Sequence, residues 1–397
     1  MNAQSCDVAI LGGGLAGGLT ALAIARARPG LNILLLEQGD TLGGNHVWSF
    51  FGSDVGKAGR ELLAPMVAGA WPGYDVRFPA YERTLGTPYY SITSEKFDAA
   101  LRAALPADAV RTGTRVIACS AQSLTLSDGT RIEAGCVIDA RGIRNLGHLT
   151  GGWQKFMGRR IKLPSPHGLQ RPVLMDATVD QIDGYRFIYC LPFSDTEIFI
   201  EDTYYSDSPT LDTTSLAGRI DAYATAHGWH GGEVMGEETG VLPVVAGGDF
   251  DAFWRSTGGV VARVGTRAAL FHPLTSYSLP DAVRFALDIA RRADAGGPML
   301  AAFTERRARE HWRKAKFYRL LAAMLFGAGA PMDRYRVLER FYRLDRRLIE
   351  RFYAGRSTTV DKARVLAGKP PVPLGSALRI LLGGTKLPAL SLAGTRK

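Results

Sequence analysis

Four residues near the N-terminus have the types and spacing to hold a dinucleotide. Gly12, Gly14 and Gly17 form a G-x-G-x-x-G pattern directly after the apolar segment 8–11, and Glu37 lies about twenty residues further on. In such a pattern the first glycine permits a tight turn, the second lets a pyrophosphate approach the backbone, and the third lets helix and strand pack closely. The following helix offers free N–H groups to phosphates, and the acid would meet a ribose hydroxyl. The sequence therefore predicts a dinucleotide site on a β-α-β unit.

Two later strand-to-loop junctions could bring polar groups to the same site. The apolar segment 136–139 predicts a strand that ends in Asp139 and is followed by Arg141. Residues 259–265 predict another strand, which leads through a loop into a helix over 282–290. Arg141 is expected to position Asp139 or a cofactor rather than to carry out chemistry itself.

Glu201 is the second candidate for chemistry. Residues 186–192 and 197–205 predict two paired strands, and alternation in the second strand places Phe199 and Glu201 on one face and Asp202 on the other. Asp202 is therefore expected to have a structural role. From the pattern alone, Glu201 is either an acid or base of a site or an exposed carboxylate paired with an arginine.

The segment 43–50 combines a glycine turn with aromatic residues. It could lie against a flat ring, or its Trp and Phe side chains could simply fill the core. The pattern leaves both interpretations open.

Charge and cysteine content narrow the class of protein. The 397 residues carry a formal net charge of +10, which favours an anionic partner. The apolar run 8–25 is assigned to the nucleotide unit because of its glycines, and no basic region precedes it. We therefore expect a cytoplasmic chain with no signal peptide and no transmembrane helix. The four cysteines are scattered, so no disulfide framework and no metal site are predicted.

The C-terminal part of the chain is basic and is expected to be helical. Arginines and lysines recur among aromatics and leucines between residues 305 and 364, with one helix predicted over 334–353, and the stretch 374–393 is apolar. Such helices suit the plane of a membrane interface, with basic groups toward anionic lipid. The alternative is ordinary packed helices with solvated arginines.

Together, these segments resemble a known group of flavoproteins. The segments 12–37, 43–50 and 137–142 resemble FAD-dependent oxidoreductases of the hydroxylase type. Within that group, further segments look like the bacterial lycopene β-cyclases, and these are 44–50, 191–194, 200–203 and 271–280. The resemblance covers roughly residues 5–370. Leu274 and Ser276 stand where the family commonly has Thr and Gly.

The resemblance implies an α/β fold in which a Rossmann-like FAD-binding domain is joined to a β-rich substrate domain and a helical C-terminal region. The expected FAD-binding domain is discontinuous (1–70, 106–150 and 257–295), the substrate domain comprises 71–105 and 151–256, and the basic, membrane-associating region is 296–397. The implied cofactor-binding residues are Gly12, Gly14, Leu15, Ala16, Gly17, Glu37, Asn45, His46, Asp139, Arg141, Gly265, Pro273, Ser276 and Tyr277. The implied substrate-lining residues are Trp48, Phe50, Phe199 and Tyr277.

The activity that the resemblance implies is closure of the linear ψ-ends of lycopene into β-rings, by way of γ-carotene to β-carotene. This is an isomerisation by an intramolecular lyase, with no net redox change, assisted by reduced FAD that NADPH would prime. Glu201 maps onto the essential acid of the family, and burial among apolar groups would keep it protonated. Glu237 and Glu238 form a second acidic pair, for which a solvated turn is the favoured interpretation.

The expected partners are lycopene and related carotenoids, other carotenoid-pathway enzymes, and the cytoplasmic side of the cell membrane, where the protein would be peripheral. One alternative is an FAD- and NADPH-dependent monooxygenase or reductase acting on an isoprenoid lipid. Another is a non-catalytic carotenoid- or lipid-binding membrane protein. No nucleic-acid recognition motif accompanies the basic charge.

Overall fold

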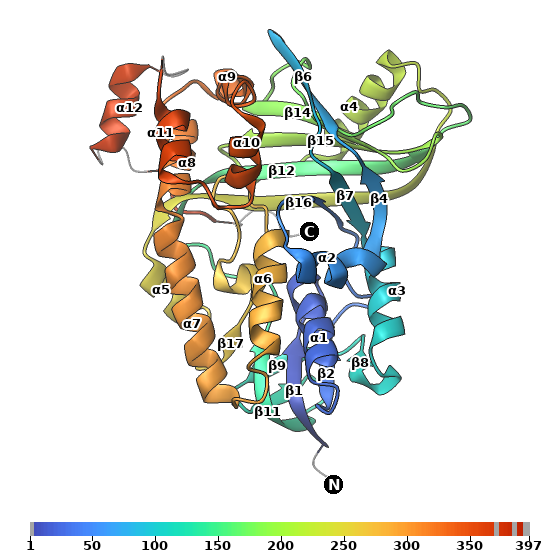
Figure 1. The fold of residues 1–397 in the computed structure, drawn as a ribbon, viewed down its shortest axis with the longest axis vertical. Coiled ribbons are helices and arrows are strands. Elements are labelled where there is room, and N and C mark those ends of the chain that lie inside the picture. The colour runs from blue at the N-terminus through green and yellow to red at the C-terminus, as the bar shows by residue number, and fades with distance from the viewer. Residues whose placement is uncertain (1–3, 369–372, 383–386, 392–397) are drawn as a thin grey trace.

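A mainly parallel sheet forms the lower half of the molecule in Figure 1. We describe residues 4–368, 373–382 and 387–391 of a computed structural model. The sheet has the order β8-β2-β1-β11-β10-β9, with β17 beside the end of β11. Its strands are β1 (Gln4–Leu11), β2 (Ile33–Leu36), β8 (Val110–Arg111), β9 (Val116–Cys119), β10 (Ser123–Leu126), β11 (Arg131–Asp139) and β17 (Ala262–Arg263). β1 is parallel to both β2 and β11 and is fully buried over residues 8–11.

Helices pack on one face of this nucleotide sheet, whereas the apolar residues of its other face cluster with residues of β9 and β10. α1 (Leu15–Ala27) and α6 (Leu279–Ala290) pack together, and α7 (Gly297–Lys314) runs along β17 and β11. α3 (Ser94–Ala104) lies against α1, because the Cβ position of Gly18 meets Leu101 and Phe97. The remaining helical segments here are α2 (Lys57–Leu63), α5 (Phe250–Ser256) and the short 3-10 turns Ala64–Met66, Ala107–Ala109 and Gly265–Ala268.

A second large sheet crosses the upper half of Figure 1, and its long strands run across the direction of α1 and α7. Its order is β16-β12-β15-β14-β13-β5-β6. The strands are β5 (Tyr74–Phe78), β6 (Tyr81–Leu85), β12 (Leu149–Lys162), β13 (Val173–Asp176), β14 (Tyr185–Pro192), β15 (Glu197–Ser206) and β16 (Glu233–Gly248). A small sheet of β3 (Val47–Phe51), β7 (Tyr89–Thr93) and β4 (Val67–Trp71) lies between the two large ones.

One face of the large sheet carries α4 (Thr213–Ala226), which packs on apolar residues including Ile198 and Ile200. The opposite face, toward the nucleotide sheet, carries Phe187, Phe199 and Tyr205 in a second apolar cluster. This cluster also includes residues of the C-terminal helices, which are α8 (Lys316–Gly327), the 3-10 turn Pro331–Asp333, α9 (Tyr335–Phe341), α10 (Arg346–Tyr353), α11 (Thr359–Leu366) and α12 (Leu374–Leu381).

Several predicted elements are confirmed and several need correction. The paired strands expected over 186–192 and 197–205 are β14 and β15. The strand expected over 259–265 is reduced to the two residues of β17, because glycines surround it. The helix expected over 334–353 is two helices, since Asp345 accepts hydrogen bonds from the backbone of Arg347 and Leu348 and starts α10 anew. The stretch 374–393 contains α12, and part of it lies outside the described residues.

Candidate active site

A cavity of about 600 Å³ connects the two large sheets. At one end it is lined by the glycine turn after β1, and at the other by Glu201 and Glu238. The predicted cofactor end and the predicted catalytic carboxylate therefore open on the same space.

The glycine turn leaves the start of α1 facing the cavity. Gly12 has φ +100°, and a Cβ there would lie 3.0 Å from the carbonyl of Ala140. At Gly17 a Cβ would lie 1.9 Å from the carbonyl oxygen of Gly12, so helix and strand could not approach as they do. Gly14 has open space at its Cβ position and caps α1 without a side-chain hydrogen bond. The free N–H groups at this helix end suit an anionic group. Gly17 itself does not line the cavity, and its role is packing.

Glu37 lies beside this turn, at the end of β2. Its Oε2 accepts a hydrogen bond of 2.7 Å from the backbone N–H of Gly13, and its Oε1 accepts one of 2.9 Å from that of Gly39. The carboxylate lines the cavity together with Leu15 and Ala16. Backbone donors on both sides thus orient it where a ribose of a bound dinucleotide could be held.

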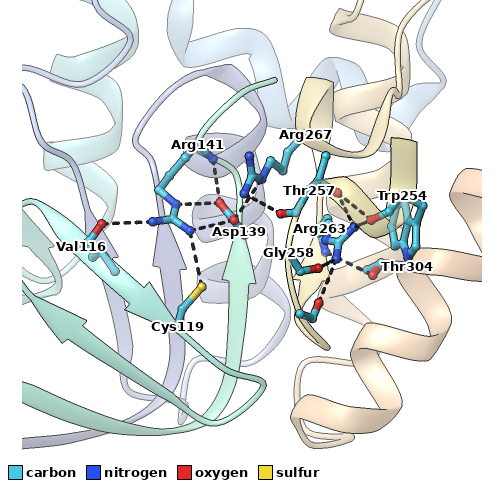
Figure 2. A network of polar contacts seen from close by, with 11 residues as sticks. Val116, Cys119, Asp139, Arg141, Trp254, Thr257, Gly258, Arg263, Arg267 and Thr304 are labelled. Carbon is cyan, nitrogen blue, oxygen red and sulfur yellow. Dashed lines mark hydrogen bonds and ion pairs between the residues drawn. The ribbon is translucent and has the colours of Figure 1, made fainter. Parts of the chain in front are cut away.

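A network of arginines surrounds Asp139 at the end of β11 (Figure 2). Nε and Nη2 of Arg141 each lie 2.9 Å from an oxygen of Asp139, and Nε of Arg267 lies 3.1 Å away. Arg263 does not pair with Asp139: it stacks over Trp254, and its Nη1 donates to the carbonyl of that residue.

Two arginines therefore decide the charge of Asp139. Burial alone would raise the pKa of this carboxyl, but hydrogen bonds from Arg141 and the charges of Arg141 and Arg267 outweigh burial and hold its pKa below the usual value. Arg141 lines the cavity, whereas Asp139 is only 1% exposed and does not. Asp139 and Arg141 therefore hold each other in place, and Arg141 is the one of the two that reaches the cavity.

The loop after β17 closes the middle of the cavity. Gly265 has φ +60°, and a Cβ there would lie 2.5 Å from Cβ of Ala16. Ser276 has φ +55°, in the left-handed region that favours glycine, and its Oγ donates to the carbonyl of Pro243 at 2.7 Å. The Tyr277 hydroxyl donates to Asp54 at 2.5 Å. Gly265, Ser276 and Tyr277 line the cavity.

Besides Gly17 and Asp139, two further residues expected in the cofactor site do not line the main cavity. The carbonyl of Pro273 accepts a hydrogen bond from the backbone of Val245, and the residue borders a smaller neighbouring cavity. The Asn45 side chain donates to the carbonyl of Glu237 at 3.0 Å and does not line the main cavity. His46, the next residue, does line it.

At the far end of the cavity, strand register brings four residues into one row. Tyr189 on β14 pairs with Glu201 on β15, which pairs with Gly158 on β12, which pairs with Glu238 on β16. Residues paired in this way point to the same face of a sheet. A Cβ at Gly158 would lie 2.2 Å from the ring of Phe199. The Phe199 ring therefore occupies the space above β12, between the strand of Glu201 and the strand of Glu238.

Glu201 is in an environment that favours its neutral form. It lines the cavity, and its Oε1 accepts a hydrogen bond of 2.5 Å from the Thr203 hydroxyl. Burial and the nearby carboxylate of Glu238 raise the pKa of Glu201 to about 8. Asp202 faces away and forms a buried ion pair of 2.8 Å with Arg186, the structural role expected for it.

Glu238 is not in a solvated turn, and that interpretation was wrong. The glycines at 236 and 240 flank the two acids and make the segment resemble a turn in the sequence. In the structure β16 continues through residues 236–240, because its long pairing with β12 keeps this segment in the sheet. Glu238 is 4% exposed; its Oε1 lies 2.8 Å from Nδ1 of His46, and its Oε2 accepts from the backbone N–H of Val47 at 3.0 Å. Glu237 points elsewhere and pairs with Arg159.

Only two of the four expected substrate-lining aromatics line the cavity. Trp48 and Tyr277 do, whereas Phe50 stacks on Tyr90 within the core, and Phe199 packs over Gly158. The remaining aromatic lining was missed, and it consists of Phe51, Tyr89, Phe156, Phe187, Tyr189, Tyr205, Tyr342 and Tyr353. Alternation within β14 could have revealed two of these residues, since Phe187 and Tyr189 share the face that is paired with Thr203 and Glu201.

Among the residues that the structure describes, we find no helix that is both long enough and apolar enough to cross a membrane.

Comparison with solved structures defines the class of fold. The chain is similar to a geranylgeranyl bacteriochlorophyll reductase-like protein from Thermoplasma acidophilum, with a TM-score of 0.60 and 15% identity over 97% of this chain and 100% of that one. It is also similar to pqsL, a probable FAD-dependent monooxygenase from Pseudomonas aeruginosa, with a TM-score of 0.55 and 17% identity over 85% and 100%. The predicted α/β fold of hydroxylase-type flavoproteins is therefore confirmed.

Comparison of sequences then identifies the family. The family model described as lycopene cyclase protein matches residues 7–379. A lycopene beta-cyclase from Pseudescherichia vulneris is 46% identical over 376 residues, which are 95% of this chain and 97% of that protein. The chain belongs to the lycopene cyclase family.

Proposed function

We propose that this chain is a lycopene β-cyclase that holds FAD at the glycine-turn end of the cavity and closes the ψ-ends of lycopene at the Glu201 end. The observation that carries the proposal is the position of Glu201, a carboxyl group with a raised pKa on the aromatic wall of a cavity that continues to the glycine turn. Family membership and the near full-length similarity to a lycopene beta-cyclase support it.

The residues at the nucleotide end fit a dinucleotide. The uncapped start of α1 and the open space at Gly14 suit a pyrophosphate, and Glu37 suits a ribose. Arg141 and Gly265 line the same end. A reduced flavin bound there would supply negative charge beside the substrate, which stabilises a developing carbocation, and NADPH is the reductant we propose.

The chain's own residues account for the proton transfer that starts the reaction. Protonation of an isolated alkene requires a neutral acid and a site that excludes water. Because the pKa of Glu201 is raised, its carboxyl carries a proton at neutral pH and donates it to C2 of the ψ-end. The resulting cation at C1 is attacked by the C5=C6 double bond, which closes the ring and moves the positive charge to C5.

The aromatic wall stabilises these cations and shapes the folded chain. Faces of Phe187, Tyr189 and Tyr205 line the cavity near Glu201. Each aromatic face contributes on the order of 1 kcal/mol to a nearby cation. The same wall excludes water, which would otherwise trap the cation as an alcohol.

The proposal extends to the membrane, because lycopene is a lipid. Helices α11 and α12 expose apolar side chains, which are Leu366 on α11, Leu378 on α12 and Leu382 directly after α12. The basic residues Arg364 and Arg379 lie on the same two helices. We propose that this region of the predicted segment 296–397 rests on anionic lipid at the cytoplasmic face of the membrane. Sedimentation with anionic but not with neutral vesicles is the expected result.

The activity is tested by anaerobic turnover of lycopene in liposomes with FAD and a reductant, comparing the wild type with Glu201→Gln. We expect β-carotene without stoichiometric consumption of reductant, and a variant that binds FAD but is at least roughly 10³-fold slower. Untouched lycopene, together with NADPH oxidation in air in the presence of an isoprenoid lipid, would instead identify a monooxygenase or reductase.

A further inference from the structure

The cyclisation needs a base as well as an acid. After ring closure the cation at C5 must lose the hydrogen on C6 to give the β-ring, and the Glu201 carboxyl has by then given its proton to C2. A second polar group on the same cavity is His46, which Glu238 contacts. Neither residue is used by the first half of the reaction.

The contacts of Glu238 favour one tautomer of the histidine. Oε2 of Glu238 accepts a hydrogen bond from the backbone N–H of Val47 at 3.0 Å, and Oε1 lies 2.8 Å from Nδ1 of His46. When Nδ1 donates this hydrogen bond to the carboxylate, Nε2 keeps its lone pair and faces other partners. An acid that holds an imidazole in this way makes it a better base, as in the catalytic triads of hydrolases.

The histidine is also held from its backbone and opens on the cavity. The carbonyl of His46 accepts a hydrogen bond from the backbone of Ser94 at 2.9 Å. Its side chain is 44% exposed and lines the cavity, whereas that of Glu238 is 5% exposed beneath it. The ring centroid lies 5.7 Å from that of Trp48, which also lines the cavity. A buried carboxylate under a fixed imidazole that faces substrate is the arrangement of a base and its positioning residue.

The charges around this pair are consistent with such a role. Glu238 is two strands from Glu201 in the same row and faces the same side of the sheet. Arg159, the nearest arginine along that part of β12, is engaged with Asp221 and Glu237 instead. Within the described residues His46 is the ion-pair partner recorded for Glu238, so a proton taken up by the imidazole is stabilised by the carboxylate beside it.

We propose that His46 is the base that removes the C6 proton and that Glu238 is its positioning residue. The inference rests on the proposed cyclase function. The Glu201 carboxyl gives its proton to C2, the C5=C6 electrons form the C1–C6 bond, the proton on C6 passes to Nε2 of His46, and the electrons of the broken C6–H bond form the C5=C6 double bond again. After the product leaves, the proton on His46 returns to Glu201 by way of solvent and restores the site, so the reaction is an isomerisation overall.

The test is the product spectrum of His46→Gln with lycopene, because a cation at C5 can also lose a proton from C4 or from the attached methyl group. We expect the variant to bind FAD like the wild type, to turn over roughly 10²-fold more slowly, and to form some rings with the double bond displaced from C5=C6. With lycopene deuterated at C6, its kinetic isotope effect should exceed that of the wild type. Glu238→Gln should show the same changes to a smaller degree, and His230→Gln, at an exposed histidine, should show none.

Three outcomes would overturn the inference. One is a His46→Gln enzyme that makes only β-rings at the wild-type rate. Another is a slow variant with only β-rings and an unchanged isotope effect, which would exclude His46 from the deprotonation step. The third is loss of FAD binding, which would make His46 a cofactor contact. Failure of the wild type to form β-carotene would instead reject the proposed function itself.

Discussion

Asp139 is buried behind one end of the cavity and Glu201 lines the other end, and the charge states of these two carboxyl groups differ. Asp139 lies between Arg141 and Arg267, and its pKa is below the usual value in spite of burial. Glu201 has a threonine hydroxyl as its partner and a second carboxylate nearby, and burial together with that carboxylate raises its pKa to about 8. The comparison shows that the partners of a buried acid, rather than burial itself, decide whether it stays ionised.

The two ends thus have different tasks. The nucleotide end carries fixed charges and backbone donors, which suit an anionic ligand in the proposed function. The substrate end has to keep a transferable proton on Glu201. An arginine beside this carboxyl group would favour its ionised form and remove that proton. The predictions below disturb one end at a time, beginning with the largest effect.

Asp139→Asn should be the most destabilising of these changes. It leaves Arg141 and Arg267 buried without their carboxylate, and breaking such a buried pair costs about 3–5 kcal/mol. Urea unfolding measures this loss, and Asp108→Asn, at an exposed acid, is the control.

The loss caused by Asp139→Asn should also depend on pH. Because the pKa of Asp139 is depressed on folding, its stabilisation is present above the unfolded pKa of about 3.9 and disappears as pH falls through the folded value. The difference in free energy of unfolding between wild type and variant should therefore become smaller in acid. A difference of less than about 1 kcal/mol at neutral pH would contradict the stabilising role of the Asp139 ion pairs.

Raising the pH should inactivate the substrate end without affecting the nucleotide end. The acid form of Glu201 is present below about pH 8 and is lost above it, so kcat/KM for lycopene should fall about tenfold per pH unit beyond that value. FAD affinity should stay constant over the same range, because Asp139 remains ionised throughout. A rate that rises through pH 8 would show that Glu201 acts only as a carboxylate.

Gly158→Ala should disturb the row of paired residues that holds Glu201 and Glu238. The new Cβ would lie 2.2 Å from the Phe199 ring, and moving that buried ring should cost about 1–3 kcal/mol and displace it toward Glu201. We expect slower cyclisation with little change in FAD affinity. Gly236→Ala, where a Cβ meets open space, is the matched control. Equal activity of the two variants would show that the row tolerates repacking.

Tyr189→Phe should have the smallest effect. The Tyr189 hydroxyl donates to Ser49 at 2.7 Å and lies 3.0 Å from that of Tyr89, while its ring remains in the variant. Loss of the hydroxyl should reduce the free energy of unfolding by about 1 kcal/mol and the rate by less than roughly tenfold. Differential scanning calorimetry and turnover assays measure both, and a rate loss as large as that of Glu201→Gln would indicate that the hydroxyl itself transfers protons.

The same contrast explains how much could be predicted from the sequence. The turn at Gly12, Gly14 and Gly17 and the acid Glu37 lie within or directly after one short β-α-β unit, β1-α1-β2, so their spacing alone predicted them. The face of Glu201 followed from alternation within one strand.

Other features depend on register between distant strands. Glu238 meets His46 across 192 residues, and no local pattern separates a glycine-flanked strand acid from a turn. The resemblance implied Phe50 as a lining residue, but Phe51 lines the cavity instead, because the sequence of a strand does not say which of its two faces meets the cavity. The break before α10 is different, because Asp345 is a recognisable N-cap and could have been predicted.

The central claim is that Glu201 is protonated at neutral pH. Difference infrared spectra of the FAD-loaded protein, with Glu201→Gln as reference, follow its carboxyl stretch as pH is raised. We expect a protonated carboxyl band at pH 7 that disappears with a midpoint near 8. A carboxylate band already complete at pH 6 would contradict the account, because Glu201 could then not supply the proton that starts cyclisation.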